Sequence, residues 1–426
     1  MRIMWIAPLL MRDACIAAGL PEGVVGGWVQ SQLSALLEVY GNANEYFILS
    51  LASRKCDIQI GNVHHRSFGK GVVTYGASVP VDVEAEAKAA IAEFNPDIIH
   101  IHGTEFFYGR MRKDVYCNKP VVVSLQGILH GLHLQVGGFL SPKEIFWDQF
   151  NLRRFLYGTS ILKTQTMWRE ERVPQENLVF KTHSHFMGRT EWDKAWMSAL
   201  NPDATYHHVN ETLRPEFYGA VRRNRTTIIP HSIYCSVAAG YPLKGVHFLF
   251  RAVALLKHKY PDITLRICAA ERLTGPITLM SVLKADQWTT YLRRLMKDLG
   301  IERHIVGLSK LSASEVRKEL SKAELFVLPS LCENSPNSLG EAQLVGTPAI
   351  ATFVGGMPSV LRDCIDGRLV PAADPAALSA MIDWFFSHPK EADEYALSAR
   401  NAAIVRHDPK RNAEATMKTY VDVASR

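Results

Sequence analysis

The residue types and spacing best suited to chemistry occur at Glu333 and Glu341, which stand eight positions apart. They flank a predicted helix start, and the apolar run 325–329 before them is typical of a short buried strand. Ser335 is a suitable N-cap for this helix. Pro336 suits the first helical position, because the N–H that it lacks would be unpaired there anyway. The pattern predicts a strand, a loop and a helix with one carboxylate before the helix and one inside it.

The first amides of that helix form a candidate anion site. Asn337 and Ser338 would present N–H groups where the helix dipole favours negative charge, so a phosphate could bind there. A second loop, Gly355-Gly356-Met357-Pro358, follows the next strand-like run at 349–353. Parallel strands bring such loops to one sheet edge, where α/β proteins bind ligands. A single acidic helix start is most often structural, but the two loops together favour a site for a nucleotide-sugar.

Lys244 is the candidate cation of this half of the chain. It lies in Tyr241-Pro-Leu-Lys-Gly245, after a predicted strand and before a predicted helix. A lysine at the mouth of a βα turn is a suitable point charge for a phosphate. A solvated lysine at a helix start is the alternative, and the sequence does not decide between them.

The first half carries candidates for the acceptor side of a site, each at a predicted strand end or helix start. They are Gly26, Gly27, His102, Gln126, His130 and Arg189. The glycines do not form GxGxxG, which disfavours dinucleotide binding. His100 and His102 share a strand face and could bind a metal ion together. No third ligand is visible, so a structural role, in which both histidines form hydrogen bonds within the protein, is favoured over a metal site. Thr190 and Asp193 match a capping box.

The elements that must position these residues alternate between strand-like and helical periodicity, which predicts an α/β fold with parallel sheets. The first series of strands is expected at 2–7, 46–51, 97–102, 121–125, 178–180 with 184–186, and 205–209. The second series is expected at 226–229, 264–269, 304–307, 324–328, 349–353 and 368–370. A polar, basic stretch at 213–225 separates them. We therefore expect an acceptor-binding domain at 1–220 and a nucleotide-sugar-binding domain at 221–407.

Composition limits the function classes. The chain has 426 residues, 47% of them hydrophobic and 21% charged, which is typical of a globular protein of about two domains. The net charge of +6, from 48 basic and 42 acidic residues, is scattered, which disfavours nucleic-acid binding and is compatible with weak attraction to an anionic membrane surface. Seven cysteines without a CxxC pair favour a reducing cytoplasm over a disulfide framework or a zinc site. No apolar run is long enough to predict a transmembrane helix.

The spacing of Glu333 and Glu341 resembles the E-x7-E motif of retaining family 4 glycosyltransferases of GT-B fold. Leu328-Pro-Ser330, Gly346-Thr-Pro348, the Gly355-Gly356 turn and Asp366-Gly367 fit the same pattern. The resemblance is fairly specific in the second half and looser in the first. It implies two Rossmann-like domains that face each other across a cleft, with residues after about 408 packed back on the first domain.

The resemblance also implies roles. Glu333 would contact the donor sugar, Glu341 the nucleotide ribose, and Lys244 the diphosphate, while the amides after Gly355 would help to hold the donor. No cofactor or metal ion is implied. The chain departs from the family at Ala239, where an arginine is usual, at Pro336, where a glycine is frequent, and at Gln126, where many members carry a histidine.

We therefore expect a retaining, metal-independent hexosyltransferase that moves a sugar from a nucleoside diphosphate-sugar to a glycan or lipid-linked glycan. Such an enzyme would act in the cytoplasm, at the inner membrane face, in the synthesis of a cell-surface polysaccharide. Two alternatives stay open: a nucleotide-sugar epimerase or hydrolase of the same fold, and an inactive sugar-nucleotide-binding subunit. The base, the sugar, the acceptor and the oligomeric state are not predicted.

Overall fold

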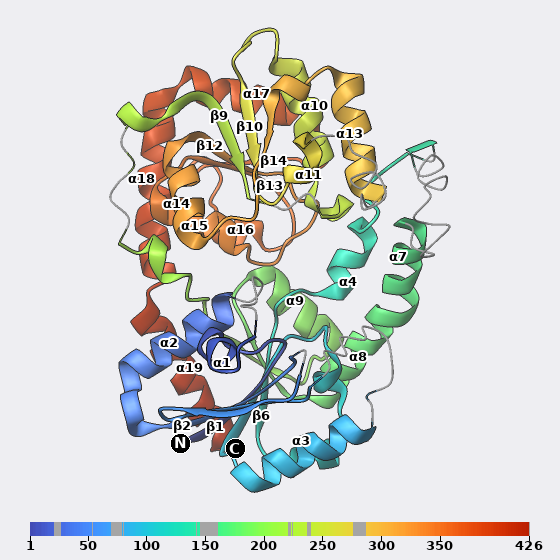
Figure 1. The fold of residues 1–426 in the computed structure, drawn as a ribbon, viewed down its shortest axis with the longest axis vertical. Helices are drawn as coiled ribbons and strands as arrows, with labels where there is room; N and C mark the ends of the chain where they lie inside the picture. Colours follow the sequence, from blue (N-terminus) through green and yellow to red (C-terminus); the bar gives the residue numbers. More distant parts are fainter. Residues whose placement is uncertain are drawn as a thin grey trace. The chain divides into compact units, whose positions relative to one another are not determined.

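The computed structural model describes residues 1–20, 27–52, 54–69, 79, 81–141, 143–144, 161–219, 223, 225–236, 240–275 and 287–425. The chain divides into two compact units. The first comprises Met1–His130, Met167–Arg214 and His407–Arg426, and the second comprises Gly131–Thr166 and Pro215–Arg406. Each unit is built on a mostly parallel sheet with helices on both faces (Figure 1). The expected α/β class with two Rossmann-like domains is confirmed.

The units differ from the expected division of the chain at residues 215–220, which belong to the second unit, and in one longer segment. Residues 131–166 group with the second unit, although we expected the first domain to run unbroken from 1 to 220. Specific contacts explain this. The Glu144 carboxylate accepts from Arg251 Nη2 at 2.8 Å and from the Tyr291 hydroxyl at 2.5 Å, and both partners belong to the second unit.

The first unit contains an eight-stranded sheet in the order β3-β4-β2-β1-β5-β6-β7-β8. Neighbouring strands are parallel except β3, which runs antiparallel to β4. The strands are β1 (Arg2–Ala7), β2 (Glu45–Ser50), β3 (Asp57–Ile60), β4 (Val63–Ser67), β5 (Ile98–His102), β6 (Val121–Ser124), β7 (His185–Gly188) and β8 (Thr205–His208). The helices of this unit are α1 (Arg12–Ala17), α2 (Gly27–Tyr40), α3 (Val81–Phe94), α8 (Val173–Thr182) and α9 (Glu191–Leu200). The division between the units falls inside α4 (Leu129–Leu132), and α7 (Ile161–Met167) belongs to the second unit except for its last residue.

Strand β1 shows why this sheet needs helices on both sides. Ile3 and Trp5 face a core shared with α2 and with α19 (Pro409–Ala424), whereas Met4 and Ile6 face a core shared with α3 and α8. All four side chains are fully buried. Successive side chains in a strand point to opposite faces, so an unbroken apolar run requires cover on both.

Helix α8 contains residues 178–180, which we expected to form a strand. That prediction was wrong. Glu176, Val179 and Phe180 are all buried, and they stand three and four positions apart. This spacing places them on one helical face, so the apolar pair belongs to a helix that packs on the sheet.

The last helix, α19, lies beside α2 in the first unit, and both are visible near β1 in Figure 1. Its Tyr420 hydroxyl is fully buried and accepts a hydrogen bond from Trp5 Nε1 at 2.9 Å. The same hydroxyl lies 2.6 Å from His100 Nδ1, and the Nε2 of His100 lies 2.6 Å from the Ser124 hydroxyl. Helix α19 is thus tied to β1 and β5 by buried polar contacts as well as by packing.

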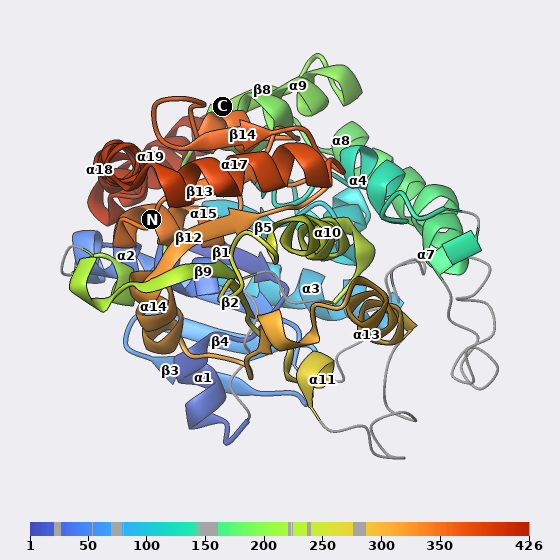
Figure 2. The same cartoon turned by 90° about the horizontal axis from the view of Figure 1, so that it is seen from above.

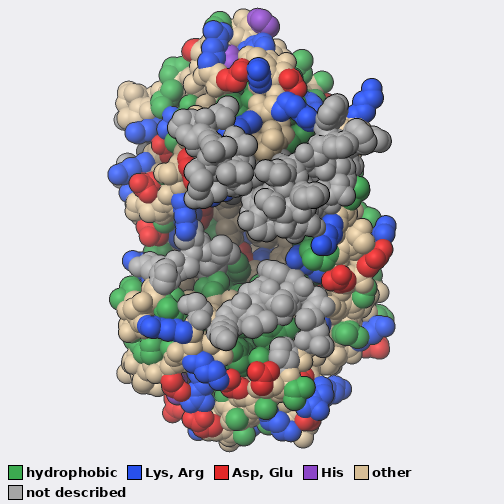
Figure 3. All heavy atoms as spheres, turned by 45° about the vertical axis from the view of Figure 1, so that its right-hand side comes forward, with side chains coloured by type: hydrophobic (Ala, Val, Ile, Leu, Met, Phe, Trp, Pro, Cys, Tyr) green, Lys and Arg blue, Asp and Glu red, His purple; other side chains and the backbone are tan. Residues whose placement is uncertain are grey.

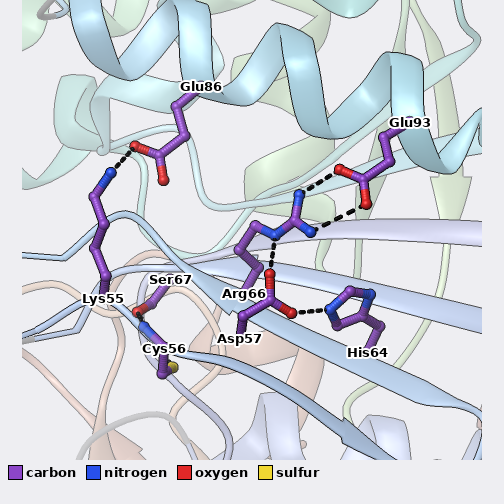
Figure 4. Close-up of polar contacts among 8 residues, drawn as sticks. All are labelled: Lys55, Cys56, Asp57, His64, Arg66, Ser67, Glu86 and Glu93. Carbon is purple, nitrogen blue, oxygen red and sulfur yellow. Dashed lines mark hydrogen bonds and ion pairs between the residues drawn. The ribbon is translucent and has the colours of Figure 1, made fainter.

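Charged side chains cover the outer strands of this sheet. Arg66 on β4 donates to Glu93 at 2.7 and 3.1 Å and to Asp57 on β3 at 2.7 Å, and Asp57 also contacts His64 (Figure 4). The Arg66 guanidinium holds the pKa of Glu93 below its usual value. Charge on an edge strand discourages pairing with another chain. The cluster is best explained as protection of this edge.

The second unit contains a parallel sheet in the order β11-β10-β9-β12-β13-β14. Its strands are β9 (Ile229–Cys235), β10 (Thr264–Ile267), β11 (Ile305–Gly307), β12 (Ala323–Leu328), β13 (Ala349–Thr352) and β14 (Arg368–Val370). Its helices are α10 (Val246–Leu256), α11 (Glu271–Thr274), α13 (Gln287–Leu299), α14 (Ala313–Lys322), α15 (Asn337–Val345), α16 (Met357–Val360), α17 (Pro375–Ser387) and α18 (Pro389–Arg406). Helix α10 contacts both α13 and α17 (Figure 2), and α15 contacts both α14 and α18.

None of the described helices combines the length and hydrophobicity that crossing a bilayer requires. On the face drawn in Figure 3, lysine and arginine side chains are interspersed with aspartate and glutamate side chains. The described residues on that face therefore form no single-sign patch of the kind that draws nucleic acid to a surface.

Candidate active site

Three loops of the second unit meet at one edge of its sheet. Strands β9, β12 and β13 are parallel neighbours, so the loops that leave their carboxyl ends lie side by side. These loops carry Lys244, Glu333 and Gly355 respectively. In open α/β sheets, ligands bind at the carboxyl ends of the strands. The arrangement brings together the residues that the sequence singled out in this half of the chain.

A glycine allows the first two loops to touch. Gly245 has a positive φ of +68°, and a Cβ atom added to it would lie 1.9 Å from the carbonyl oxygen of Pro329. The amide of Leu331 donates to the carbonyl of Leu243 at 2.8 Å. Only glycine fits such a contact, and the loop after β9 is thereby joined to the loop after β12.

Lys244 and Glu333 form an ion pair at this edge, with the ammonium Nζ 2.6 Å from Oε1 of the carboxylate. The Ser330 hydroxyl donates to the same oxygen at 2.8 Å. The two charged side chains are 22% and 15% exposed, so a ligand can still reach them. Burial alone would disfavour the ammonium, but attraction to Glu333 outweighs it and raises the pKa of Lys244. Lys244 is therefore a fixed positive charge at neutral pH.

The turn after β13 supports Glu333 through its backbone. The Gly356 amide donates to the carbonyl of Glu333 at 2.9 Å, and the Met357 amide donates to the carbonyl of Val354 at 3.0 Å. Gly355 has a φ of +51°, and an added Cβ would lie 2.1 Å from the Glu333 carbonyl oxygen. The amides of Gly356 and Met357 were expected to hold the donor. Both amides donate to carbonyls of the protein here, and the assignment of these residues to the donor stays a prediction.

Helix α15 begins one residue later than we expected. Pro336, with an extended ψ of 114°, occupies the N-cap position in place of Ser335, and the helix starts at Asn337. The Pro336 carbonyl accepts the first helical hydrogen bond, from Leu339 at 3.0 Å. Proline cannot donate, but its carbonyl can open the helix, which explains the shift.

The first turns of α15 hold the remaining donor-side candidates. Asn337 and Ser338 are its first two residues, and the side-chain oxygen of Asn337 is buried without a hydrogen-bond partner among the described residues. Glu341 follows Asn337 by four positions and is 5% exposed. Residues four apart lie on one helical face. A buried amide oxygen and a buried carboxylate thus share a face near the start of the helix.

In the first unit, the candidate histidines differ in their surroundings. Both nitrogens of His100 contact protein hydroxyls, so it is a satisfied core residue. His102, at the end of β5, is 1% exposed, and neither of its nitrogens has a hydrogen-bond partner among the described residues. Burial lowers its pKa to about 3, so the imidazole is neutral. The His102 ring packs against the Trp5 ring, with the ring centroids 4.5 Å apart and the planes tilted by 56°.

His130 is held by a carboxylate that the sequence did not single out. Glu176 on α8 has a fully buried side chain and lies 2.7 Å from Nδ1 of His130. It also accepts from the amides of Leu129 and His130, each at 3.1 Å, and from the Thr104 hydroxyl at 2.6 Å. The helical spacing of α8 was the signal that would have found Glu176, but we read that segment as a strand.

Gln126 and Arg189 are brought together. The guanidinium of Arg189 donates to the side-chain oxygen of Gln126 at 3.1 Å and lies 2.8 Å from the carboxylate of Glu211, which the sequence analysis missed. The predicted capping box is confirmed: Thr190 caps α9 and bonds reciprocally with Asp193. Asp193 also accepts from the Arg189 amide at 3.0 Å, which fixes the backbone that carries the arginine.

A second acidic residue was also missed. Burial raises the pKa of Glu105, in the loop after β5, to about 7. Its Oε2 has no hydrogen-bond partner among the described residues. Of the glycine pair, Gly27 opens α2, with the Arg214 side chain 3.3 Å from where its Cβ would stand. Gly26, like Ala239 in the other half, lies outside the described residues.

The second unit resembles known glycosyltransferases in sequence. The sequence profile of the family described as "Glycosyl transferases group 1" matches residues 228–402. The D-inositol 3-phosphate glycosyltransferase of Streptomyces coelicolor is 32% identical over 148 residues, which is 35% of this chain and 31% of that protein. A GDP-mannose-dependent alpha-(1-6)-phosphatidylinositol monomannoside mannosyltransferase of Mycolicibacterium smegmatis is 24% identical over 220 residues, 49% of this chain and 54% of that protein. The chain thus spans about a third to a half of these relatives.

Solved structures resemble the chain over nearly its whole length. Sucrose-phosphate synthase from Thermosynechococcus elongatus has a TM-score of 0.71 at 15% identity, covering 100% of this chain and 99% of that one. Anabaena Alr3699/HepE, in complex with UDP and glucose, has a TM-score of 0.66 at 14% identity, covering 99% and 100%. At this identity the likeness concerns the fold alone. Residues 228–402 are therefore similar in sequence to the group 1 glycosyl transferases, and the chain has the fold of GT-B glycosyltransferases.

Proposed function

We propose that this protein is a retaining glycosyltransferase that transfers a sugar from a nucleoside diphosphate-sugar to a glycan or lipid-linked glycan. The observation that carries the proposal is the Lys244–Glu333 pair at the carboxyl edge of a parallel sheet, beside the start of α15. The match of residues 228–402 to group 1 glycosyl transferases supports it. The spacing of Glu333 and Glu341 matches the E-x7-E motif of family 4 and supports the proposal.

The charges of the donor fit the residues at this edge. A diphosphate is anionic, and Lys244 with the first amides of α15 is suited to receive it. When the diphosphate binds, it competes with Glu333 for the ammonium. Glu333 is then available to accept hydrogen bonds from hydroxyls of the donor sugar. Glu341 is assigned to the nucleotide ribose.

The barrier to transfer is largely electrostatic. The bond between the anomeric carbon and the phosphate oxygen breaks, so negative charge grows on the departing diphosphate. The ion pair with Glu333 keeps the Lys244 ammonium at this edge before the donor binds, and once the diphosphate has displaced Glu333 the ammonium stabilises the growing charge. The acceptor oxygen bonds to the anomeric carbon on the same face, and its proton passes to the leaving phosphate. This route retains the anomeric configuration.

No metal ion is assigned a role, because the lysine supplies the cation that the leaving group needs. Activity should then persist in a chelator. The acceptor is assigned to the first unit, at the carboxyl ends of β5 to β8. We place the reaction in the cytoplasm, at the inner membrane face, in polysaccharide synthesis.

Nucleotide release tests the proposal. Purified protein is supplied with UDP-glucose or GDP-mannose and a panel of glycan acceptors, and free nucleoside diphosphate is measured. Lys244→Ala should lower turnover by at least about tenfold. Lys259→Ala is the matched control, because Lys259 is 59% exposed and pairs with Asp383. Acceptor-independent loss of donor would indicate a hydrolase or epimerase, and donor binding without release would indicate an inactive subunit.

A further inference from the structure

The first unit contains a small polar pocket at the carboxyl edge of its sheet. Its volume is about 20 Å³. It is bounded by the start of α2, the ends of β6 and β7, and the segment after β8. The lining residues used below are Trp28, Arg189, Asn210, Glu211 and Thr212. All of them belong to one unit, so the pocket exists within that unit alone.

The described residues that line the pocket carry no net charge. Among them only Arg189 and Glu211 are charged, and these two lie 2.8 Å apart with 7% and 8% of their side chains exposed. A phosphate or carboxylate entering the pocket would compete with Glu211 for Arg189 and would bring a second negative charge beside that buried carboxylate. Two like charges at one buried site repel each other strongly, so the pair disfavours an anionic ligand group.

The pocket nevertheless offers unused hydrogen-bonding capacity. Trp28 Nε1, Arg189 Nε and Thr212 Oγ1 are buried, and within the described chain none of these three atoms has a hydrogen-bond partner. Thr212 as a residue is only 4% exposed. Trp28 Nε1 and Arg189 Nε can only donate, so a ligand group that binds in this pocket must accept hydrogen bonds. A hydroxyl oxygen accepts two and can donate one in return, to Glu211 or to the Asn210 side chain.

The size limits what can enter. A volume of about 20 Å³ holds one or two oxygen-sized groups, not a sugar ring. We propose that this pocket receives an uncharged hydroxyl or hydroxymethyl group of the acceptor, and that the enzyme therefore selects acceptors that are neutral at that position. This inference rests on the proposed function, and it names the acceptor class that the Arg189–Glu211 pair admits.

Matched acceptors test the proposal on the full-length protein. The panel pairs methyl hexopyranosides with the corresponding methyl uronides, which differ only in a hydroxymethyl or carboxylate group. The wild-type protein should prefer the neutral member of a pair in kcat/KM by at least about tenfold. Glu211→Gln leaves Arg189 without its counter-charge, so the preference should shift toward the uronide by about tenfold.

A second variant separates binding from folding. Thr212→Val should raise the KM of the neutral acceptor by about three- to thirtyfold, because one hydrogen bond is lost, while the KM of the donor stays unchanged. Thr205→Val, on β8 and outside the pocket lining, is the control and should change neither constant. A wild-type preference for uronides, or a preference that Glu211→Gln leaves unchanged, would overturn the proposal.

Direct binding distinguishes failure of this inference from failure of the proposed function. If no acceptor supports nucleotide release, the same pairs are titrated by ligand-observed NMR against the wild-type protein and Thr212→Val. Neutral members that bind more tightly than their uronides, and lose affinity in Thr212→Val, would support the pocket without transferase activity. Equal binding, or none by any neutral member, would overturn it.

Discussion

Replacing Glu105 by glutamine should stabilise the first unit at high pH and leave it unchanged at low pH. Burial raises the pKa of this carboxyl from 4.5 to about 7 in the folded protein. The shift of about 2.5 pH units corresponds to at most about 3.4 kcal/mol at about 1.36 kcal/mol per unit. The residue is only partly buried, so water that reaches it should reduce the effect to about 1–2 kcal/mol.

The sign follows from which state binds more protons. Between pH 4.5 and about 7 the folded protein keeps a proton on Glu105 that the unfolded chain has lost. The free energy of unfolding therefore falls as pH rises through this window, and the full penalty applies above pH 7. Glutamine cannot ionise, so Glu105→Gln removes the penalty. The gain should be about 1–2 kcal/mol at pH 8 and close to zero at pH 4.5.

Hydrogen exchange of peptides from β1 and β5 measures this, because it reports on the first unit separately from the second. Glu191→Gln is the matched control, since the Glu191 side chain is 84% exposed. The reasoning is refuted if Glu105→Gln is no more stable than the wild-type protein at pH 8. It is also refuted if the gain is the same at pH 5 and pH 8.

Two further substitutions test the packing described above. Tyr420→Phe should destabilise the first unit by about 1–3 kcal/mol, because Trp5 and His100 each lose a buried hydrogen-bond partner. Hydrogen exchange of β1 peptides measures this change, and a loss of stability below about 0.5 kcal/mol would contradict the prediction. Gly355→Ala should abolish donor binding, because its Cβ would lie 2.1 Å from the Glu333 carbonyl oxygen and its φ is positive. A thermal-shift titration with UDP and GDP checks the second outcome, and unchanged binding would remove this turn from the site.

Strands buried on both faces were predictable because their apolar runs are continuous. Strand β1 was predicted at its observed bounds, and β12 and β13 lie within one residue of theirs. The hairpin of β3 and β4 was missed. More exposed and less exposed residues alternate along both strands, and several of these residues are polar, so no continuous apolar run marks the hairpin in the sequence. The residues between its strands, Gly61 and Asn62, form a two-residue connection that was the available signal.

The site was predictable where local sequence determines it. The loop after β12 and Lys244 were identified because helix starts and strand ends carry local signatures. Glu211 and Glu176 were not, because their roles depend on partners that are distant in sequence. Glu211 meets Arg189 from a segment beyond β8, and Glu176 reaches His130 across 46 positions. No short sequence motif indicates contacts between residues that are so far apart in the chain.

The position of α19 has a consequence for synthesis on the ribosome. Residues 215–406 are continuous in the second unit, whereas the first unit is completed only by residues 407–426. The face of β1 that carries Ile3 and Trp5 therefore stays without the cover of α19 until residues 215–406 have been synthesised. During that interval this apolar face is accessible to chaperones, whereas all residues of the second unit are already available for folding.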